Sequence, residues 1–423
     1  MPACHNNKER SRYTNQILFL GISLILIVAL VLHLRHQWTL ADRLYWNTYY
    51  YSEFLINYQG GFVRRGLLGE VIYQIASGFE VPVEKIIWTV SYGSYGLVLL
   101  FLFYKFIRKG LCWWIILSPF LCGLTVNIIR KDYLCYCVLI GMIWCLRKGI
   151  VSYSRLVIAI ILGVLGLLIH ESFIFYGVPA MVWILFRSRQ SLKASVSALV
   201  LGGLFIVLCV FRGSEETALS IIDSWNAVIP GAPIEHIHDN SIGTLTWNMK
   251  ETFTNHFLIN FHSPEIGWWL IGVRVAVFLL STVLISGFFI TFRRERTDFN
   301  EMDRANVLAL YLGLICCLLP MFLILSCDFG RLYQYAFMTV TAIYLLVPRE
   351  ILGLMIGERV QKVAGKCACS LTLPRVWMKC GMIILLLFLC STPDGFNVEE
   401  AFYTSPAGCI IMKLMGEVPP LLA

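Results

Sequence analysis

The chain has 423 residues, of which 58% are hydrophobic and only 14% are charged, and its mean hydropathy is +0.72. Soluble domains carry about 25% charged residues, so this composition excludes an ordinary water-soluble protein. The net charge of +8 lies mainly in short basic stretches between apolar segments, as membrane topology requires, and it therefore gives no reason to expect a nucleic-acid partner.

Apolar segments long enough to cross a bilayer recur along the chain, since a spanning helix needs roughly 17 to 25 residues. The pattern predicts an all-α, polytopic membrane protein with about 11 transmembrane helices, which form a single integral membrane domain over residues 1–423. The first segment has no small-residue cleavage site and is interpreted as a retained helix. The predicted spans are 14–33, 88–104, 111–128, 133–146, 156–169, 172–186, 194–211, 266–292, 306–326, 332–347 and 380–392.

Basic residues predict the orientation, because cytoplasmic loops retain Lys and Arg during insertion. Clusters such as Lys105 with Arg108, and Arg147 with Lys148, fall on one side when the N-terminus is cytoplasmic. The other side has two long loops, 34–87 and 212–265, which we expect to contain short interfacial helices. The pattern is typical of a multi-pass protein of the bacterial inner membrane.

Charged residues outside the basic inner loops are candidates for function, because ionisable groups near lipid are costly to keep. They gather at the predicted outer ends of the helices. The candidates are Asp42, Arg64 and Arg65 in the first outer loop, Arg130, Lys131 and Asp132 between the third and fourth spans, His170 and Glu171 between the fifth and sixth, Arg274 within the eighth, and Asp328 and Arg331 between the ninth and tenth.

The segment from Gly60 to Gly69 is the most distinctive of the chain. Its glycines would let a ligand approach closely, and the adjacent forks of Arg64 and Arg65 suit phosphate or pyrophosphate oxygens. The alternative is an amphipathic interfacial helix whose arginines face lipid headgroups.

Two short turns carry the candidate bases. His170 and Glu171 form a turn in which a base with a tuned pKa, or a simple helix cap, would fit. In the second turn, Asp328 and Arg331 would bind substrate or pair with each other.

Arg274 lies within a predicted span. Its side chain would snorkel to the interface or point into a cavity.

The outer turn formed by Arg130, Lys131 and Asp132 runs against the positive-inside trend. These three charges are therefore either retained for function or used to anchor the turn to lipid headgroups.

Motifs for bound nucleotides, zinc and serine-hydrolase chemistry are missing from the sequence. No Asp-x-Asp pair follows the first span. We therefore expect no cofactor and no metal.

Three short motifs resemble the Wzy-type or EpsG-like repeat-unit polymerases of surface polysaccharide assembly and the wider GT-C class of membrane glycosyltransferases. They are Asn127-Ile128-Ile129-Arg130, then His170-Glu171-Ser172 with an apolar run to Pro179, and Asp328-Phe329-Gly330-Arg331 followed by Tyr333 and Tyr335. The Gly60 to Gly69 segment is not part of this resemblance.

The resemblance implies glycosyl transfer from a polyprenyl-pyrophosphate-linked glycan to a hydroxyl of a second lipid-linked glycan, at the outer face of the inner membrane. The implied partners are these substrates, the bilayer and other polysaccharide-assembly proteins. Arginines at the pyrophosphate would stabilise the leaving group without a metal, and a carboxylate or His would take the acceptor proton. The implied bases are Glu171 or His170, then Asp328 or Asp42, and the implied substrate-binding residues are Arg64, Arg65, Arg130, Lys131, Asp132, Arg274 and Arg331.

Alternatives from other classes remain. A single-sugar GT-C transferase would use a polyprenyl-phosphate sugar at a similar site. A polysaccharide or lipid transporter would place its charges near the bilayer midplane, and a membrane O-acyltransferase would need a path for a cytoplasmic acyl donor. The charges of this chain gather at one face, which favours a transferase.

Overall fold

The computed structural model describes residues 49–108, 129–229, 240–248, 250–254, 301–325, 329–348 and 406–416, with a few single residues and short stretches between them. Every regular element in this part of the chain is helical, which confirms the all-α prediction there. The predicted spans 14–33 and 380–392, nearly all of 111–128 and most of 266–292 lie outside the described residues.

Most described helices coincide with predicted spans. They are α4 (Val83–Arg108), α5 (Asp132–Leu146), α6 (Tyr153–Ile169), α7 (Phe173–Arg187), α8 (Ser191–Val210), α12 (Glu301–Pro320), continued by the short η3 (Met321–Leu325), and α13 (Phe329–Leu346); α18 (Pro406–Leu414) is a further short helix. Among the residues that the structure describes, three segments are long and apolar enough to cross a membrane: Val83–Arg108, Ser191–Val210 and Asn306–Leu323. The helices α5, α6 and α7 are apolar but shorter. The structure therefore supports a helical membrane protein, and the count of about 11 spans stays a prediction.

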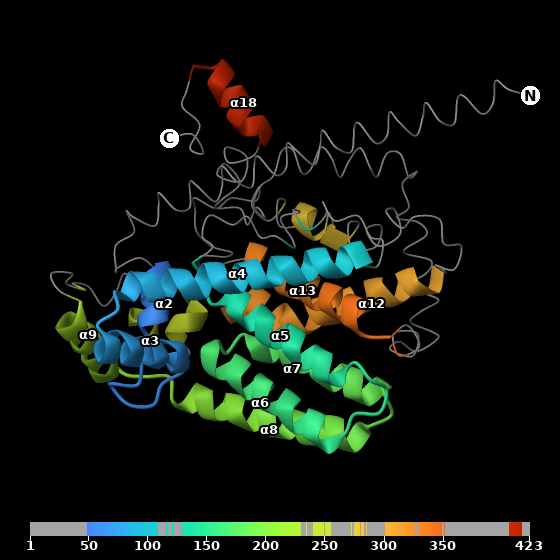
Figure 1. Cartoon of the computed structure of the whole chain (residues 1–423), viewed down its shortest axis with the longest axis horizontal. Coiled ribbons are helices and arrows are strands. Elements are labelled where there is room, and N and C mark those ends of the chain that lie inside the picture. The colour runs from blue at the N-terminus through green and yellow to red at the C-terminus, as the bar shows by residue number, and fades with distance from the viewer. Residues whose placement is uncertain are drawn as a thin grey trace, which may run out of the picture.

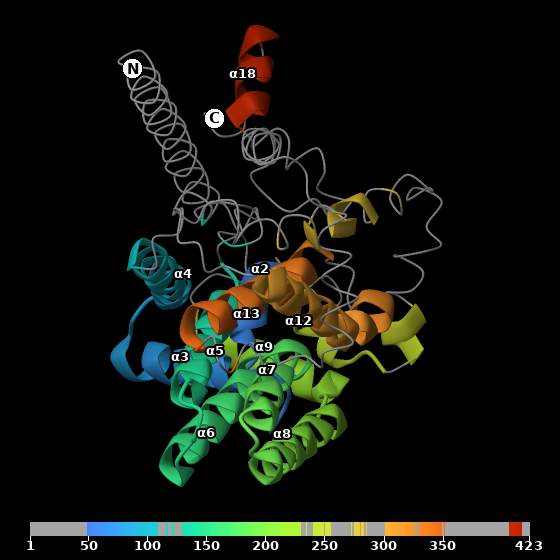
Figure 2. The same cartoon turned by 90° about the vertical axis from the view of Figure 1, so that its right-hand side faces the viewer.

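The apolar helices form a layered bundle. Viewed along the bundle, α6 and α8 lie in one layer, α5 and α7 in the next, and α12 and α13 beyond them (Figure 2). The inner helices bury apolar side chains at helical spacing, as α5 does with Tyr136, Leu139 and Ile143. By contrast, α8 leaves Leu199 and Ile206 largely exposed. An apolar face of this length is suited to contact with lipid.

The two predicted outer loops pack against each other. Residues 34–87 contribute α2 (Tyr49–Leu55) and α3 (Gly66–Phe79), and residues 212–265 contribute α9 (Glu215–Val228) and the 3₁₀ turn η2 (Gly243–Leu245). These four elements, here called the cap, share a second hydrophobic cluster and lie together at one end of the bundle (Figure 1).

Polar contacts also join the two halves of the cap. The fully buried Trp225 donates its indole N–H to the carbonyl oxygen of Leu55 at 2.6 Å, and the side-chain amide of Asn57 donates to the hydroxyl of Ser224. The prediction of short helices in both loops is confirmed for the described residues.

The glycines of the Gly60 to Gly69 segment pack against the protein itself. A methyl group at Gly69 would lie 2.0 Å from the carbonyl oxygen of Ile56, and one at Gly66 would lie 2.2 Å from the ring of Tyr58. A methyl group at Gly60 would lie 2.6 Å from the carbonyl oxygen of Thr217. The prediction that these glycines admit a ligand is therefore wrong for these three, because atoms of the cap already fill the space.

Gly69→Ala should lower the free energy of unfolding by about 1 to 3 kcal/mol, because the added methyl group meets rigid backbone. Gly78→Ala is the matched control in the same helix: nothing lies within 4 Å of its methyl position, so it should stabilise the protein by about 0.5 to 1 kcal/mol. The check is the thermal unfolding of both purified variants in detergent. Equal melting temperatures would contradict the packing account.

Candidate functional site

Four helices, α3 of the cap and α5, α7 and α13 of the bundle, begin close to one another. Arg65 precedes the first residue of α3, Lys131 precedes that of α5, Glu171 lies in the turn before α7, and Arg331 lies in the first turn of α13. Direct contacts join these four positions, as described below. Because a helix N-terminus carries partial positive charge, the backbone adds to the positive potential at this place.

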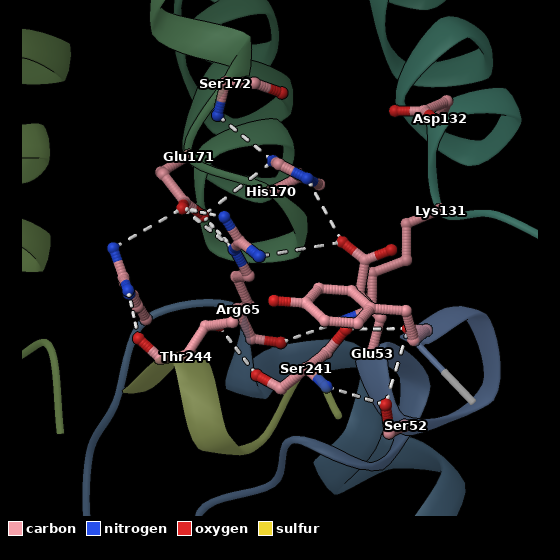
Figure 3. A network of polar contacts seen from close by, with 12 residues as sticks. Ser52, Glu53, Arg65, Lys131, Asp132, His170, Glu171, Ser172, Ser241 and Thr244 are labelled. Atoms are coloured by element: carbon pink, nitrogen blue, oxygen red, sulfur yellow. Dashed lines mark hydrogen bonds and ion pairs between the residues drawn. The ribbon is translucent and has the colours of Figure 1, made fainter. Parts of the chain in front are cut away.

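Arg65 and Glu171 form the central ion pair of the site. The Nε of Arg65 lies 2.8 Å from Oε1 and 2.7 Å from Oε2 of Glu171, and its Nη2 also donates to Oε1. Figure 3 shows the guanidinium of Arg65 between Glu171 and Glu53. The predicted alternative of an interfacial helix with headgroup-facing arginines does not fit Arg65, because its guanidinium faces carboxylates of the protein.

The backbone of Arg65 is held in an unusual conformation. Its φ is 64°, in the left-handed region that costs a non-glycine residue of the order of 1 kcal/mol. The Nζ of Lys131 donates to the carbonyl oxygen of Arg65 at 3.0 Å, and the Lys131 side chain is only 1% exposed. Burial lowers the pKa of Lys131 to about 8, against the attraction of Glu53. Lys131 therefore holds the backbone of Arg65 in place from a buried position.

Glu53 of α2 connects most of the charged residues, although sequence reasoning gave it no role. Its Oε1 lies 3.1 Å from Nε2 of His170 and 3.9 Å from a guanidinium nitrogen of both Arg65 and Arg331. Burial alone would raise the pKa of Glu53, but His170, then Arg331 and Lys131, bring it well below its ordinary value. The signal that could have identified it is a lone carboxylate within an apolar run.

Arg331 and Asp132 form a second ion pair. The Nε of Arg331 lies 2.9 Å from Oδ2 of Asp132 and donates to the hydroxyl oxygen of Tyr335 at 2.8 Å. The hydroxyl of Tyr335 donates to Oδ1 of Asp132. The ring of Tyr335 stacks on that of Tyr176 with centroids 4.4 Å apart. This second pair is therefore anchored in the aromatic interior of the bundle.

Both ring nitrogens of His170 are engaged by protein groups. Nδ1 accepts from the backbone N–H of Ser172 at 3.2 Å, while Nε2 faces Glu53 and also lies 2.9 Å from Nη2 of Arg331. His170 is 4% exposed. It therefore links Ser172, Glu53 and Arg331 from a buried position. The side chain of Ser172 makes no capping hydrogen bond, but His170 accepts from a backbone N–H at the start of α7, so the cap interpretation of this turn stays open beside the functional one.

Arg64 extends the positive surface toward η2. Its Nη2 donates to the carbonyl oxygen of Thr244 at 2.9 Å, and its Nη1 lies 3.8 Å from Oε1 of Glu171. The buried Nε of Arg64 has no hydrogen-bond partner. Burial lowers the pKa of Arg64; Glu171 opposes this effect, and the charges of Arg65 and Arg212 add to it. One donor of this guanidinium is therefore unused.

Exposure divides the cluster into two layers. The side chains of Arg64, Arg65, Arg331 and Glu171 are 16–21% exposed, whereas those of Glu53, His170 and Asp132 are 4–8% exposed. The accessible layer thus holds three positive charges and one negative charge. A surface of this kind has a net preference for an anionic ligand with several oxygens.

Seven of the sequence-predicted residues therefore meet in one cluster, and Arg130 is half-buried immediately before Lys131. Arg331 pairs with Asp132. Asp42, Arg274 and Asp328 lie outside the described residues. The seven are Arg64, Arg65, Lys131, Asp132, His170, Glu171 and Arg331.

The described residues contain no group of three or more His, Cys, Asp or Glu side chains that could hold a metal ion. The expectation that the site needs no metal stays a prediction.

Comparison with known proteins yields no match: no family model fits the sequence, and neither a curated protein nor a solved structure is similar to it. The resemblance to polysaccharide polymerases therefore stays a prediction.

Proposed function

We propose that this chain is a membrane glycosyltransferase that moves a glycan from a polyprenyl-pyrophosphate donor to a hydroxyl of a second lipid-linked glycan. The observation that carries the proposal is the accessible layer of Arg64, Arg65, Arg331 and Glu171, with its excess of positive charge, at the end of an apolar bundle. In this proposal the layer faces the outside of a bacterial inner membrane, and the N-terminus is cytoplasmic, as the basic loops predict.

The leaving group explains the need for arginines. When the bond between the anomeric carbon and the pyrophosphate breaks, negative charge develops on the phosphate oxygens. A guanidinium fork donates two parallel hydrogen bonds to such oxygens, and Arg65 already presents Nε and Nη2 to the two oxygens of a carboxylate. Arg64 and Arg331 supply further charge in the same layer, so no metal is required by this mechanism.

The position of the site suits a lipid-linked substrate. Helices such as α8 expose apolar side chains along their length, where a polyprenyl chain would be soluble. The charged cluster lies where α3, α5, α7 and α13 begin, so the pyrophosphate of such a lipid would meet the arginines while its chain stays in the bilayer. A transporter would instead hold its charges near the middle of the bundle.

Glu171 is the candidate base, because it is the accessible carboxylate of the cluster. Burial would raise its pKa, but Arg65, His170 and Arg64 together hold that pKa far below the ordinary range of a glutamate. While the pair with Arg65 persists, Glu171 is therefore a weak base. His170, Asp132 and Glu53 lie deeper, and we assign them to positioning.

Purified protein in nanodiscs, supplied with a polyprenyl-pyrophosphate-linked oligosaccharide, should release polyprenyl pyrophosphate and form a longer lipid-linked glycan. Mass spectrometry of the lipid extract measures both products. A product one sugar longer, formed only from a polyprenyl-phosphate sugar, would identify the single-sugar transferase instead. No transfer from either donor would contradict the proposed class.

In a deletion strain, a single-repeat surface glycan indicates a polymerase, and loss of one branch sugar indicates a transferase.

A further inference from the structure

We propose that Glu171 occupies the phosphate position on Arg65 in the resting protein, and that donor binding displaces it and so creates the catalytic base. The inference rests on the proposed function, since it takes the anionic ligand to be a polyprenyl pyrophosphate. It adds an order of events: the base becomes active only after the donor has bound.

The contact between the two residues has the geometry of anion recognition. Both carboxylate oxygens of Glu171 lie against the edge of the Arg65 guanidinium formed by Nε and Nη2, and Nη1 of Arg64 lies 3.8 Å from the same Oε1. A phosphate group offers the same pair of oxygens at the same spacing to a guanidinium fork. Glu171 therefore covers the donors of Arg65 that a pyrophosphate would use.

Glu171 is also the member of the pair that can move. It lies in the short turn between α6 and α7, and beyond the two arginines its ion-pair contact is Nδ1 of His170 at 3.8 Å. Arg65 has fixed points on two sides, because Lys131 binds its carbonyl oxygen and Glu53 lies 3.9 Å from its Nη1. A competing anion would thus displace the carboxylate and leave the guanidinium in place.

Displacement changes the chemistry of Glu171. Once Arg65 is bound to phosphate, Glu171 loses its main positive partner and gains a negative neighbour, and both changes raise its pKa. The acceptor O–H can then transfer its proton to Glu171 while the acceptor oxygen forms a bond to the anomeric carbon. The bond from that carbon to the pyrophosphate oxygen breaks, and its electron pair leaves with the pyrophosphate on Arg65. Without a donor, the base remains inactive.

The test is the binding of inorganic pyrophosphate to purified, full-length protein, measured by titration calorimetry in two buffers with different ionisation enthalpies. Wild-type protein should take up a fraction of a proton from the buffer on binding, because displaced Glu171 becomes partly protonated. Glu171→Gln has no carboxylate to displace, so it should bind pyrophosphate on the order of tenfold to a hundredfold more tightly and lack that uptake. Glu215→Gln, a change at an exposed position of α9, should match wild type in both respects.

In Glu171→Gln the rate of glycosyl transfer should fall although pyrophosphate binds more tightly. Removing a general base costs on the order of a hundredfold to ten-thousandfold in rate, so Glu171→Gln should bind the anion more tightly and transfer more slowly. If the Gln variant does not fold, Glu171→Asp serves instead, with a shorter carboxylate that should bind pyrophosphate more tightly than wild type and retain proton uptake.

The outcomes separate the two proposals. Equal pyrophosphate affinity and equal proton uptake in wild type and Glu171→Gln would overturn the displacement, even where transfer activity supports the proposed function. Absence of pyrophosphate binding in both proteins, together with absence of transfer, would overturn both. Tighter binding by Glu171→Gln with the wild-type proton uptake retained would also contradict the displacement, because Glu171 would not be the group that takes up the proton.

Discussion

Arg65→Lys is expected to reduce the rate of glycosyl transfer on the order of a hundredfold to a thousandfold, although the charge is unchanged. Lysine has no planar fork and cannot reproduce the paired donors, Nε and Nη2, that now contact both oxygens of Glu171. The backbone carbonyl of residue 65 would still accept from Lys131, so the folded amount should change little. The measurement is the initial rate with a lipid-linked donor, divided by the amount of folded protein.

The matched control is Arg108→Lys, at the exposed C-terminal end of α4, where the side chain donates to the hydroxyl of Tyr104. This variant should retain wild-type activity. If Arg65→Lys kept near-normal activity as well, the bidentate role of Arg65 would be refuted, and a point charge at this position would be sufficient.

Glu53→Gln should have the largest effect on stability. Breaking a buried charge cluster by removing one partner typically costs about 3 to 5 kcal/mol, because the remaining charges stay buried without compensation. Here His170 would lose its partner at 3.1 Å, and Arg65, Arg331 and Lys131 would lose a nearby negative charge, while the side chain keeps its shape. Thermal unfolding in detergent and the amount of folded protein in membranes measure the loss.

The same carboxylate, that of Glu53, should make the stability of the wild-type protein sensitive to acid. The pKa of folded Glu53 lies well below its ordinary value, so its contribution to stability is present above about pH 4.3 and is lost progressively as the pH falls toward the folded pKa. Wild-type stability should therefore fall in acid more steeply than that of Glu53→Gln. Glu215→Gln is the control here too, because an exposed glutamate should leave the acid profile unchanged. Identical acid profiles for all three proteins would show that Glu53 is not ionised in the folded state.

The rate of glycosyl transfer and the amount of folded protein in the membrane thus distinguish the two layers of the cluster. Arg65 belongs to the accessible layer, so its variant should lose rate and keep its abundance. Glu53 belongs to the buried layer, so its variant should lose abundance first.

The described helices follow from the sequence because their cause is local. Hydropathy identifies the membrane as solvent, and the apolar runs at 133–146 and 156–169 correspond to α5 and α6. Charges at the outer ends of these runs also stand out, since they violate the sorting of basic residues to the inside. The candidate residues of the cluster could therefore be named from composition and position.

Their partners could not be named, because pairing depends on how distant helices pack. Arg65 contacts Glu171 across 106 positions of the chain, and Tyr335 contacts Asp132 across 203. The same holds for Glu53, which is a single charge in an apolar helix until α2 is placed beside His170 and Arg331. It holds also for Gly69, whose missing side chain makes room for the backbone at Ile56. Local pattern thus determined which residues form helices and which carry unexpected charge, whereas the tertiary structure alone decided which charges neutralise each other and which remain to bind a ligand.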